Sequence, residues 1–220
     1  MVKAFLFDMD GVIFDSMPIH AKAWVDAFAS VGLTFTEYQV YLQEGSTGAS
    51  TVNQVFMTQK GRAATQDEID HIYGVKCKIF ESYGRDWPMK NMDKVLDYLK
   101  SKGYTIGIVT GSGQKSLFEK LNHYYPGIFK TEYMVTAYDV TKGKPDPEPY
   151  LKGLEKCGVK ASEAVVIENA PMGISAAKAA GIYTIAINTG ILENACLKEA
   201  GADLVFDTVE DLLKHLKASF

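Results

Sequence analysis

Two aspartates stand one residue apart directly after the first apolar run of the sequence. The run Ala4–Phe7 is followed by Asp8, Met9, Asp10 and Gly11. Two carboxylates this close repel each other unless a cation lies between them, and hard oxygen ligands suit Mg²⁺. A turn stabilised by aspartate side chains is the alternative for this segment taken alone. The pair therefore indicates either a capped turn or a magnesium site with carboxylate chemistry.

Two later segments carry residues suited to hold an anion. Thr110, Gly111 and Ser112 follow an apolar run and precede an expected helix. Hydroxyls, a glycine amide and a helix start then lie together, which favours anion binding. Lys144 stands among prolines in the segment 142–149, and these fix the backbone beside a charge able to neutralise phosphate oxygens. A common Gly-Ser turn and a solvated loop lysine are the structural alternatives.

A fourth apolar run ends in an acid and an amide, Glu168 and Asn169. Both side chains carry oxygens that bind a hard cation or hold its waters. The alternative is that Asn169 caps the helix that follows.

Short apolar runs alternate with helical patterns along most of the chain. The runs are continuous, as in parallel strands buried on both faces. The expected strands are Ala4–Phe7, Tyr104–Val109, Tyr133–Val135, Ala164–Ile167, Tyr183–Ile187 and Leu204–Phe206. The expected helices are Met92–Lys102, Gln114–His123, Pro149–Cys157, Met172–Ala180 and Val209–Lys217. This alternation predicts a doubly wound, mainly parallel, Rossmann-like α/β sheet.

The segment between the first strand and residue 84 contains helical patterns and no convincing strand. Its expected helices are His20–Ser30, Glu37–Gln43, Thr51–Gln59 and Asp67–Ser82. Such an insert is expected to cover the carboxyl edge of the sheet, where open α/β sheets bind ligands. The sequence therefore predicts a core of residues 1–15 and 84–220 and a small helical cap of residues 16–83.

Four motifs follow one another in an order that resembles that of the haloacid dehalogenase superfamily of phosphatases and mutases. They are Asp-x-Asp, Thr, Lys and Glu-Asn. FDMDG is the most specific motif, and KPDPEPY and ENAPMG support it. The resemblance covers nearly the whole chain. Within the superfamily, the sequence is similar to the β-phosphoglucomutase-like branch, and the insert after Asp15 resembles the small helical cap of that branch.

This resemblance implies a role for each motif. Asp8 is the nucleophile that becomes an aspartyl-phosphate, and Asp10 is the general acid and base. Mg²⁺ is the implied cofactor, bound by Asp8, the backbone carbonyl of Asp10 and Asn169, with Glu168 as a ligand or the holder of a bound water. The implied phosphate-binding residues are Thr110, Gly111, Ser112 and Lys144.

The sequence departs from the family pattern at the metal site and in the cap. Relatives often have aspartate where this chain has Asn169, so one negative charge is missing. Glu44 in the cap is the hypothetical replacement. Mutases of this branch hold a second phosphate with a cap arginine, but no arginine occurs from Phe35 to Gly61. The other cap residues considered for substrate contact are His20, Thr47 and Lys76.

Hydrolysis of a small phosphorylated metabolite is the expected activity, with a sugar phosphate or inorganic pyrophosphate as substrate. The alternative is a β-phosphoglucomutase-type phosphomutase, and the missing arginine argues against it. A non-catalytic phosphate-binding module is a weaker alternative, because Asp8, Asp10, Thr110 and Lys144 are all present. A dehalogenase does not need the second acid, so Asp10 argues against that activity.

Composition limits the partners of the chain. The sequence has 27 acidic and 23 basic residues and shows no basic stripe, so nucleic acid is not an expected partner. Cys77, Cys157 and Cys196 lie far apart, which favours a reducing, cytoplasmic location without disulfides. No run approaches the ~20 apolar residues of a membrane span. We expect a monomer or a weak homo-oligomer.

Overall fold

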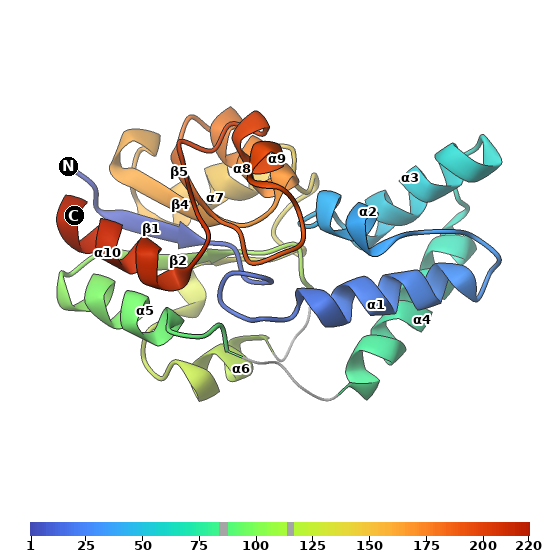
Figure 1. Ribbon diagram of the computed structural model, residues 1–220, viewed down its shortest axis with the longest axis horizontal. Coiled ribbons are helices and arrows are strands. Elements are labelled where there is room, and N and C mark those ends of the chain that lie inside the picture. Colours follow the sequence, from blue (N-terminus) through green and yellow to red (C-terminus); the bar gives the residue numbers. More distant parts are fainter. Residues whose placement is uncertain (84–87, 114–116) are drawn as a thin grey trace.

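Six parallel strands form one sheet in the order β3-β2-β1-β4-β5-β6 (Figure 1). The computed structural model describes residues 1–83, 88–113 and 117–220. The strands are β1 (Ala4–Phe7), β2 (Thr105–Val109), β3 (Met134–Val135), β4 (Ala164–Glu168), β5 (Tyr183–Ile187) and β6 (Leu204–Phe206). The sheet and the helical insert after β1 confirm the predicted fold class.

Helices connect consecutive strands and cover both faces of the sheet (Figure 1). The helices of the insert are α1 (Met17–Ala29), α2 (Glu37–Leu42), α3 (Gly48–Lys60) and α4 (Gln66–Ser82). The remaining α-helices are α5 (Met92–Ser101), α6 (Leu117–Tyr124), α7 (Glu148–Cys157), α8 (Pro171–Ala179), α9 (Asn194–Glu199) and α10 (Val209–Ser219). Single 3₁₀ turns, η1 (Thr131–Tyr133) and η2 (Ala161–Glu163), lead into β3 and β4.

The two helices with the clearest start signals begin at capping boxes. The hydroxyl of Thr36 accepts a hydrogen bond from the backbone N–H of Gln39, whose side chain bonds back to the Thr36 backbone. Thr65 and Glu68 form the same arrangement at the start of α4. These reciprocal bonds satisfy amide groups that have no partner inside the helix, which explains where α2 and α4 begin.

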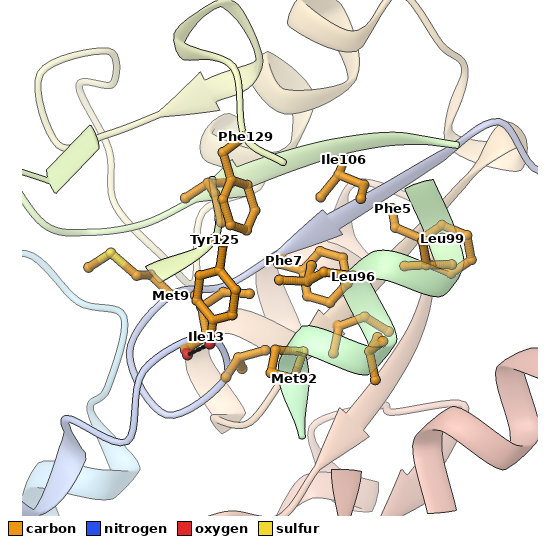
Figure 2. Packing of buried hydrophobic residues seen from close by; sticks show 14 of the residues in the cluster. Phe5, Phe7, Met9, Ile13, Met92, Leu96, Leu99, Ile106, Tyr125 and Phe129 are labelled. Atoms are coloured by element: carbon orange, nitrogen blue, oxygen red, sulfur yellow. Dashed lines mark hydrogen bonds between the residues drawn. The ribbon is translucent and has the colours of Figure 1, made fainter. Parts of the chain in front are cut away.

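Residues of β1 alternate between the two layers of the core. Phe5 and Phe7 pack with Leu96 and Leu99 of α5 on one face, where the Tyr125 hydroxyl donates a 3.0 Å hydrogen bond to the Ile13 carbonyl (Figure 2). Leu6 belongs to the cluster on the opposite face, with residues of α7 and α8. Burial of each such side chain contributes about 1.5–3 kcal/mol. This packing on both faces fixes the strand end that carries Asp8.

Helices α1 to α4 lie to one side of the sheet and share a hydrophobic cluster of their own (Figure 1). Trp24 and Phe28 from α1, Val52 from α3 and Ile72 from α4 belong to it. Leu192, from the loop between β5 and α9, is the member contributed by the sheet region. The predicted boundary at residue 84 lies outside the described residues.

Several elements differ from the sequence-based expectation. The helix α9 was not predicted, because it has six residues and too little periodicity to detect. The predicted strand Tyr133–Val135 is shorter, since Tyr133 closes the 3₁₀ turn η1. The start of the predicted helix Gln114–His123 lies outside the described residues. Helix α3 starts at Gly48 rather than Thr51, because the hydroxyl of Thr47 accepts from the backbone N–H of Ser50.

In the described part of the chain, each helix is too short or too polar to pass through a bilayer.

Candidate active site

Three neighbouring strands end at the same edge of the sheet and bring three predicted site residues together. β1 pairs with β2 on one side and with β4 on the other, all in parallel. Asp8 follows β1, Thr110 follows β2, and Glu168 is the last residue of β4. This reversal of strand order at β1 is where open α/β sheets form ligand sites.

Lys144 forms hydrogen bonds with groups at the ends of all three strands. Its ammonium group donates to Asp8 Oδ1 at 2.5 Å, to Glu168 Oε1 at 2.7 Å and to the carbonyl oxygen of Val109 at 3.1 Å. The Lys144 side chain is 1% exposed. Burial alone would lower the pKa of Lys144, but the facing carboxylates of Asp8 and Glu168 outweigh it and raise the pKa above its ordinary value. Lys144 therefore keeps its positive charge at the base of the site.

Glu168 is held by four hydrogen-bond donors. Oε1 accepts from Lys144 and from the hydroxyl of Tyr150 at 2.9 Å. Oε2 accepts from the backbone N–H groups of Asn169 at 2.9 Å and Ala170 at 3.1 Å. A β-carbon placed on Gly173 would lie 1.6 Å from Glu168 Oε1, so the first turn of α8 needs glycine there. The carboxylate is thus fixed as an anchor for Lys144.

Asn169 contacts the cap as well as the core. Its side-chain amide Nδ2 donates to both carboxylate oxygens of Glu44, at 2.9 and 3.0 Å. Both residues are buried, at 6% and 8% exposure. Among the described residues, Asn169 Oδ1 finds no hydrogen-bond partner. Gly11 permits this approach, because a β-carbon there would lie 2.1 Å from Asn169 Nδ2.

Crowded carboxylates disfavour ionisation at the centre of the site. Burial raises the pKa of Asp8 to about 8, and nearby Glu168 adds to the rise whereas Lys144 opposes it. Burial and the neighbouring charge of Asp8 raise the pKa of Glu44 well above its ordinary value. One lysine thus does not keep all of these carboxylates ionised, and a further cation would favour their charged forms.

A chain of polar groups runs from Asp10 into the cap. Asp10 Oδ1 accepts from the hydroxyl of Ser16 at 2.6 Å and lies 3.2 Å from His20 Nε2. His20 Nδ1 lies 2.9 Å from the Lys76 ammonium group. Burial alone would raise the pKa of Asp10, but His20 and the hydrogen bonds from His20 and Ser16 hold it at about 2. The ring of Phe80 stacks on the imidazole ring of His20, with 4.1 Å between the ring centroids, and holds the plane of the imidazole.

A cavity between cap and core brings together most of the predicted site residues. Those that line it are Asp8, Asp10, His20, Glu44, Lys76, Thr110, Gly111 and Ser112. Lys144 and Asn169 do not line it but bond to Asp8 and Glu44, which do. Glu168 lies behind them and bonds to Lys144. Thr47 differs: it caps α3 and lines a separate groove with Lys142 and Gly143, so its predicted substrate contact has no support in this arrangement.

The donor set fits a hard divalent cation. The unpaired carbonyl oxygen of Asn169 is buried beside the carboxylate of Glu44, and the raised pKa of Asp8 means that its carboxylate ionises more readily beside an added cation. Oxygen donors of this type suit Mg²⁺. Within residues 1–83, 88–113 and 117–220, no three His, Cys, Asp or Glu side chains are grouped to hold a metal alone. Any metal here would therefore also need amide or backbone oxygens, such as that of Asn169.

Three residues with clear contacts were missed by sequence reasoning. Ser16 bonds Asp10, Tyr150 bonds Glu168, and Tyr73 lines the cavity. Tyr150 closes the KPDPEPY segment, so its place in that motif was a usable signal. Ser16 and Tyr73 stand outside the sequence motifs, so no such signal marks them.

Known proteins resemble this chain over nearly its whole length. A structure from Bacteroides vulgatus, provisionally assigned as a β-phosphoglucomutase, superposes with a TM-score of 0.95 at 47% identity, covering 98% of this chain and 88% of that one. Hexitol phosphatase A of Escherichia coli (strain K12) is 31% identical over 210 residues, 96% of this chain and 93% of its own. A protein of Clostridium perfringens (strain 13 / Type A), provisionally named a pyrophosphatase, is 28% identical over 215 residues, 97% of this chain and 96% of its own.

The profile of haloacid dehalogenase-like hydrolases matches residues 2–181, which include every motif described above. The resemblance of the sequence motifs is therefore confirmed, and this chain is an enzyme that belongs to the haloacid dehalogenase-like hydrolase family.

Proposed function

We propose that the enzyme is a magnesium-dependent phosphohydrolase that acts on a small phosphorylated metabolite through a phosphoryl group on Asp8. One observation carries this proposal: Asp8 lies on the wall of the cavity between cap and core, with its carboxylate fixed by a buried lysine. The nearby Thr110 and Ser112 line the same cavity and are suited to bind phosphoryl oxygens. Relatives named as phosphatases agree with this activity.

The proposed reaction has two steps. A carboxylate oxygen of Asp8 attacks the phosphorus atom, and the bond from phosphorus to the leaving oxygen breaks. Asp10 gives a proton to that oxygen; because its pKa is about 2 without substrate, it takes up this proton only when the negative charge of the bound phosphate raises its pKa. Asp10 then takes a proton from a water molecule, whose oxygen attacks the phosphorus and releases phosphate from Asp8. Lys144 stays charged throughout and offsets the negative charge on Asp8 and the phosphoryl group.

Mg²⁺ would be held by Asp8, the backbone carbonyl of Asp10 and Asn169, and it would supply positive charge next to a phosphoryl oxygen. We propose that Glu168 serves mainly to orient Lys144, because four donors already occupy its two oxygens. Direct ligation by Glu168 stays a prediction. Glu44 would add the carboxylate that Asn169 lacks.

Cap chemistry favours hydrolysis over a mutase reaction. A phosphomutase must hold a second phosphate at the cap end of the cavity, where a bidentate arginine is the usual solution. Lys76 is the cation that the described cap places on the cavity wall, and it is already bonded to His20. Burial lowers the pKa of Lys76, which weakens it further as a phosphate anchor. We also propose that residues 16–83 act as a separate cap domain.

A compact substrate fits the cap better than a large one. The ring of Tyr73 lies on Gly48, where a β-carbon would be 2.4 Å from the ring. Tyr73 thus takes space at the cavity wall. The carboxylate of Glu44 repels a bulky anion more than it repels a sugar hydroxyl. When a cation is bound beside it, Glu44 instead suits a small anion that binds the metal. Inorganic pyrophosphate is therefore the favoured substrate, and small sugar or polyol phosphates are the second candidate, in line with both types of relative.

A substrate screen tests the proposed function. We expect phosphate release from pyrophosphate or from a small phosphorylated metabolite, dependent on Mg²⁺ and abolished by a chelator. Free phosphate would distinguish hydrolysis from a mutase, which returns an isomerised phosphate ester instead. Failure to release phosphate from every compound tested with Mg²⁺ present would refute the proposal.

The Glu44→Gln variant tests the cap carboxylate. We expect the Mg²⁺ concentration for half-maximal turnover to rise about 10-fold, because changing a residue that holds a metal ligand, as Glu44 holds Asn169, weakens metal affinity by about 10–100-fold. Glutamine retains the side-chain length, so the packing of the cap should be unchanged. Turnover measured across a Mg²⁺ titration reports the effect. An unchanged titration curve would show that Glu44 has no part in metal binding.

A further inference from the structure

One short loop after β5 contacts both parts that form the active site. On the core side, the hydroxyl of Thr189 donates to the carbonyl oxygen of Gly11 at 2.6 Å. On the cap side, Leu192 is 6% exposed and belongs to the hydrophobic cluster of α1 to α4. Asn188 braces the loop, because its side-chain amide donates to the Leu192 carbonyl at 2.8 Å. The loop therefore links two segments far apart in the sequence.

The cap residue that faces this loop is Tyr41 of α2. A β-carbon placed on Gly190 would lie 2.7 Å from Tyr41 Cε1, so the ring lies directly on the glycine. Tyr41 is 5% exposed and has little room to move. The Tyr41 ring is in close contact with Gly190, and Tyr41 and Leu192 belong to the same hydrophobic cluster. Together these contacts fix the position of α2 against the core.

Both contacts of the loop lead to the pair formed by Glu44 and Asn169. Glu44 follows α2 by two residues, so the position of α2 sets where its carboxylate lies. Gly11 lies against the same pair: a β-carbon on it would be 2.1 Å from Asn169 Nδ2 and 3.1 Å from Glu44 Oε1. The loop thus holds two segments beside the hydrogen-bonded contact between Glu44 and Asn169. These are the backbone of Gly11 on the core side and α2 on the cap side.

We propose that Thr189, Gly190 and Leu192 are positioning residues that place Glu44 against Asn169 in the closed arrangement of the structure, with the cap against the core. They act through α2 and the Gly11 carbonyl and do not touch the reacting atoms. The proposal rests on the proposed function only in taking the Glu44–Asn169 contact to matter for turnover. The placement of the cap segment itself can be measured without any reaction.

Two variants and a matched control test the proposal. Leu192→Ala removes the side chain from the cap cluster, and Gly190→Ala places a methyl group against the Tyr41 ring without leaving a cavity. Ile191 lies between them and is 52% exposed, so Ile191→Ala is the control. Leu192→Met keeps the apolar volume and should behave like the unchanged protein.

The first readout is amide hydrogen exchange of residues 37–47 in the substrate-free protein. We expect exchange of this segment to rise about 10-fold in Leu192→Ala and Gly190→Ala, because the closed arrangement becomes less populated. Residues 92–101 in α5, far from the loop in sequence and on another layer, should exchange as before. Equal exchange in all proteins would overturn the proposal.

The second readout separates positioning from general destabilisation. We expect KM and the half-saturating Mg²⁺ concentration each to rise about 10-fold, with kcat within about 3-fold, since bound substrate can still drive closure. A fall in kcat alone, or the same change in Ile191→Ala, would contradict the assignment. If Leu192→Ala does not fold, Gly190→Ala decides the outcome. If the unchanged protein releases no phosphate, the proposed function fails while the exchange result still decides this inference.

Discussion

Replacing Asp8 with asparagine should lower the rate of phosphate release by roughly 10⁴-fold or more, as expected when the nucleophile of a covalent mechanism is removed. Asparagine has nearly the same shape but a neutral amide that does not form a stable phosphoryl adduct. The fold should persist, because Lys144 keeps its 2.7 Å contact with Glu168. Release of phosphate from the best substrate, measured at saturating Mg²⁺, checks the loss.

A matched substitution shows whether the loss is specific. Asp97 lies on α5 with an exposed side chain, so Asp97→Asn makes the same chemical change away from the cavity. It should leave turnover unchanged. Intact-mass measurement on rapidly acid-quenched samples should detect a phosphorylated form of the unchanged protein and none of Asp8→Asn. If Asp8→Asn keeps more than about a tenth of the activity, Asp8 is not the nucleophile.

The sheet was predictable because the physical signal is local. Each continuous apolar run marks a strand buried on both faces, and the polar residues at its end mark where burial stops. Asp8, Thr110 and Glu168 each follow or end such a run. Parallel strands point the same way, so these residues had to meet at one edge once the strand order was right. Placement of the strand ends therefore needed no knowledge of distant contacts.

The contacts that complete the site were not predictable in the same way. Lys144 lies 136 residues from Asp8 in sequence. Its hydrogen-bond partners are decided by the path of the loop before α7. Tyr150 and Glu168 are both fully or nearly buried, and each satisfies the other. Burial of a polar side chain is decided by its partner, and a single sequence does not name that partner.

The cap shows the same limit more clearly. Its helical pattern was visible, but its hydrophobic cluster is completed by Leu192 from a loop 110 residues beyond the last cap helix (192 − 82). Thr47, which the sequence analysis considered for substrate contact, caps α3. A threonine before a helix satisfies backbone amides first, and only the path of the chain decides whether it also reaches a cavity. The roles of the cap residues in substrate binding stay predictions.

Replacing Lys144 with methionine should damage both stability and turnover. Methionine keeps the length of the side chain but leaves the carboxylates of Asp8 and Glu168 buried without their cation, at 4% and 1% exposure. Removing one partner of a buried ion pair destabilises a protein by about 3–5 kcal/mol. Turnover should fall roughly 10²–10³-fold, because a fixed positive charge beside the phosphoryl group is lost. Denaturant unfolding and phosphate release measure the two effects.

Two further variants separate the structural role of Lys144 from its role in the reaction. Lys142→Met makes the same change two residues earlier, where the side chain is 72% exposed and lies 3.6 Å from Asp146, and it should change neither quantity. The double variant Lys144→Met with Glu168→Gln removes one of the two carboxylates that the single variant leaves without a cation, so part of the lost stability should return. Its turnover should stay low, because Asp8 still lacks a neighbouring ammonium group. Recovery of both stability and turnover would mean that Lys144 only supports the fold. An unchanged stability of the single variant would mean that Asp8 and Glu168 need no cation in the folded protein, and the picture of a nucleophile held by a buried lysine would then be wrong.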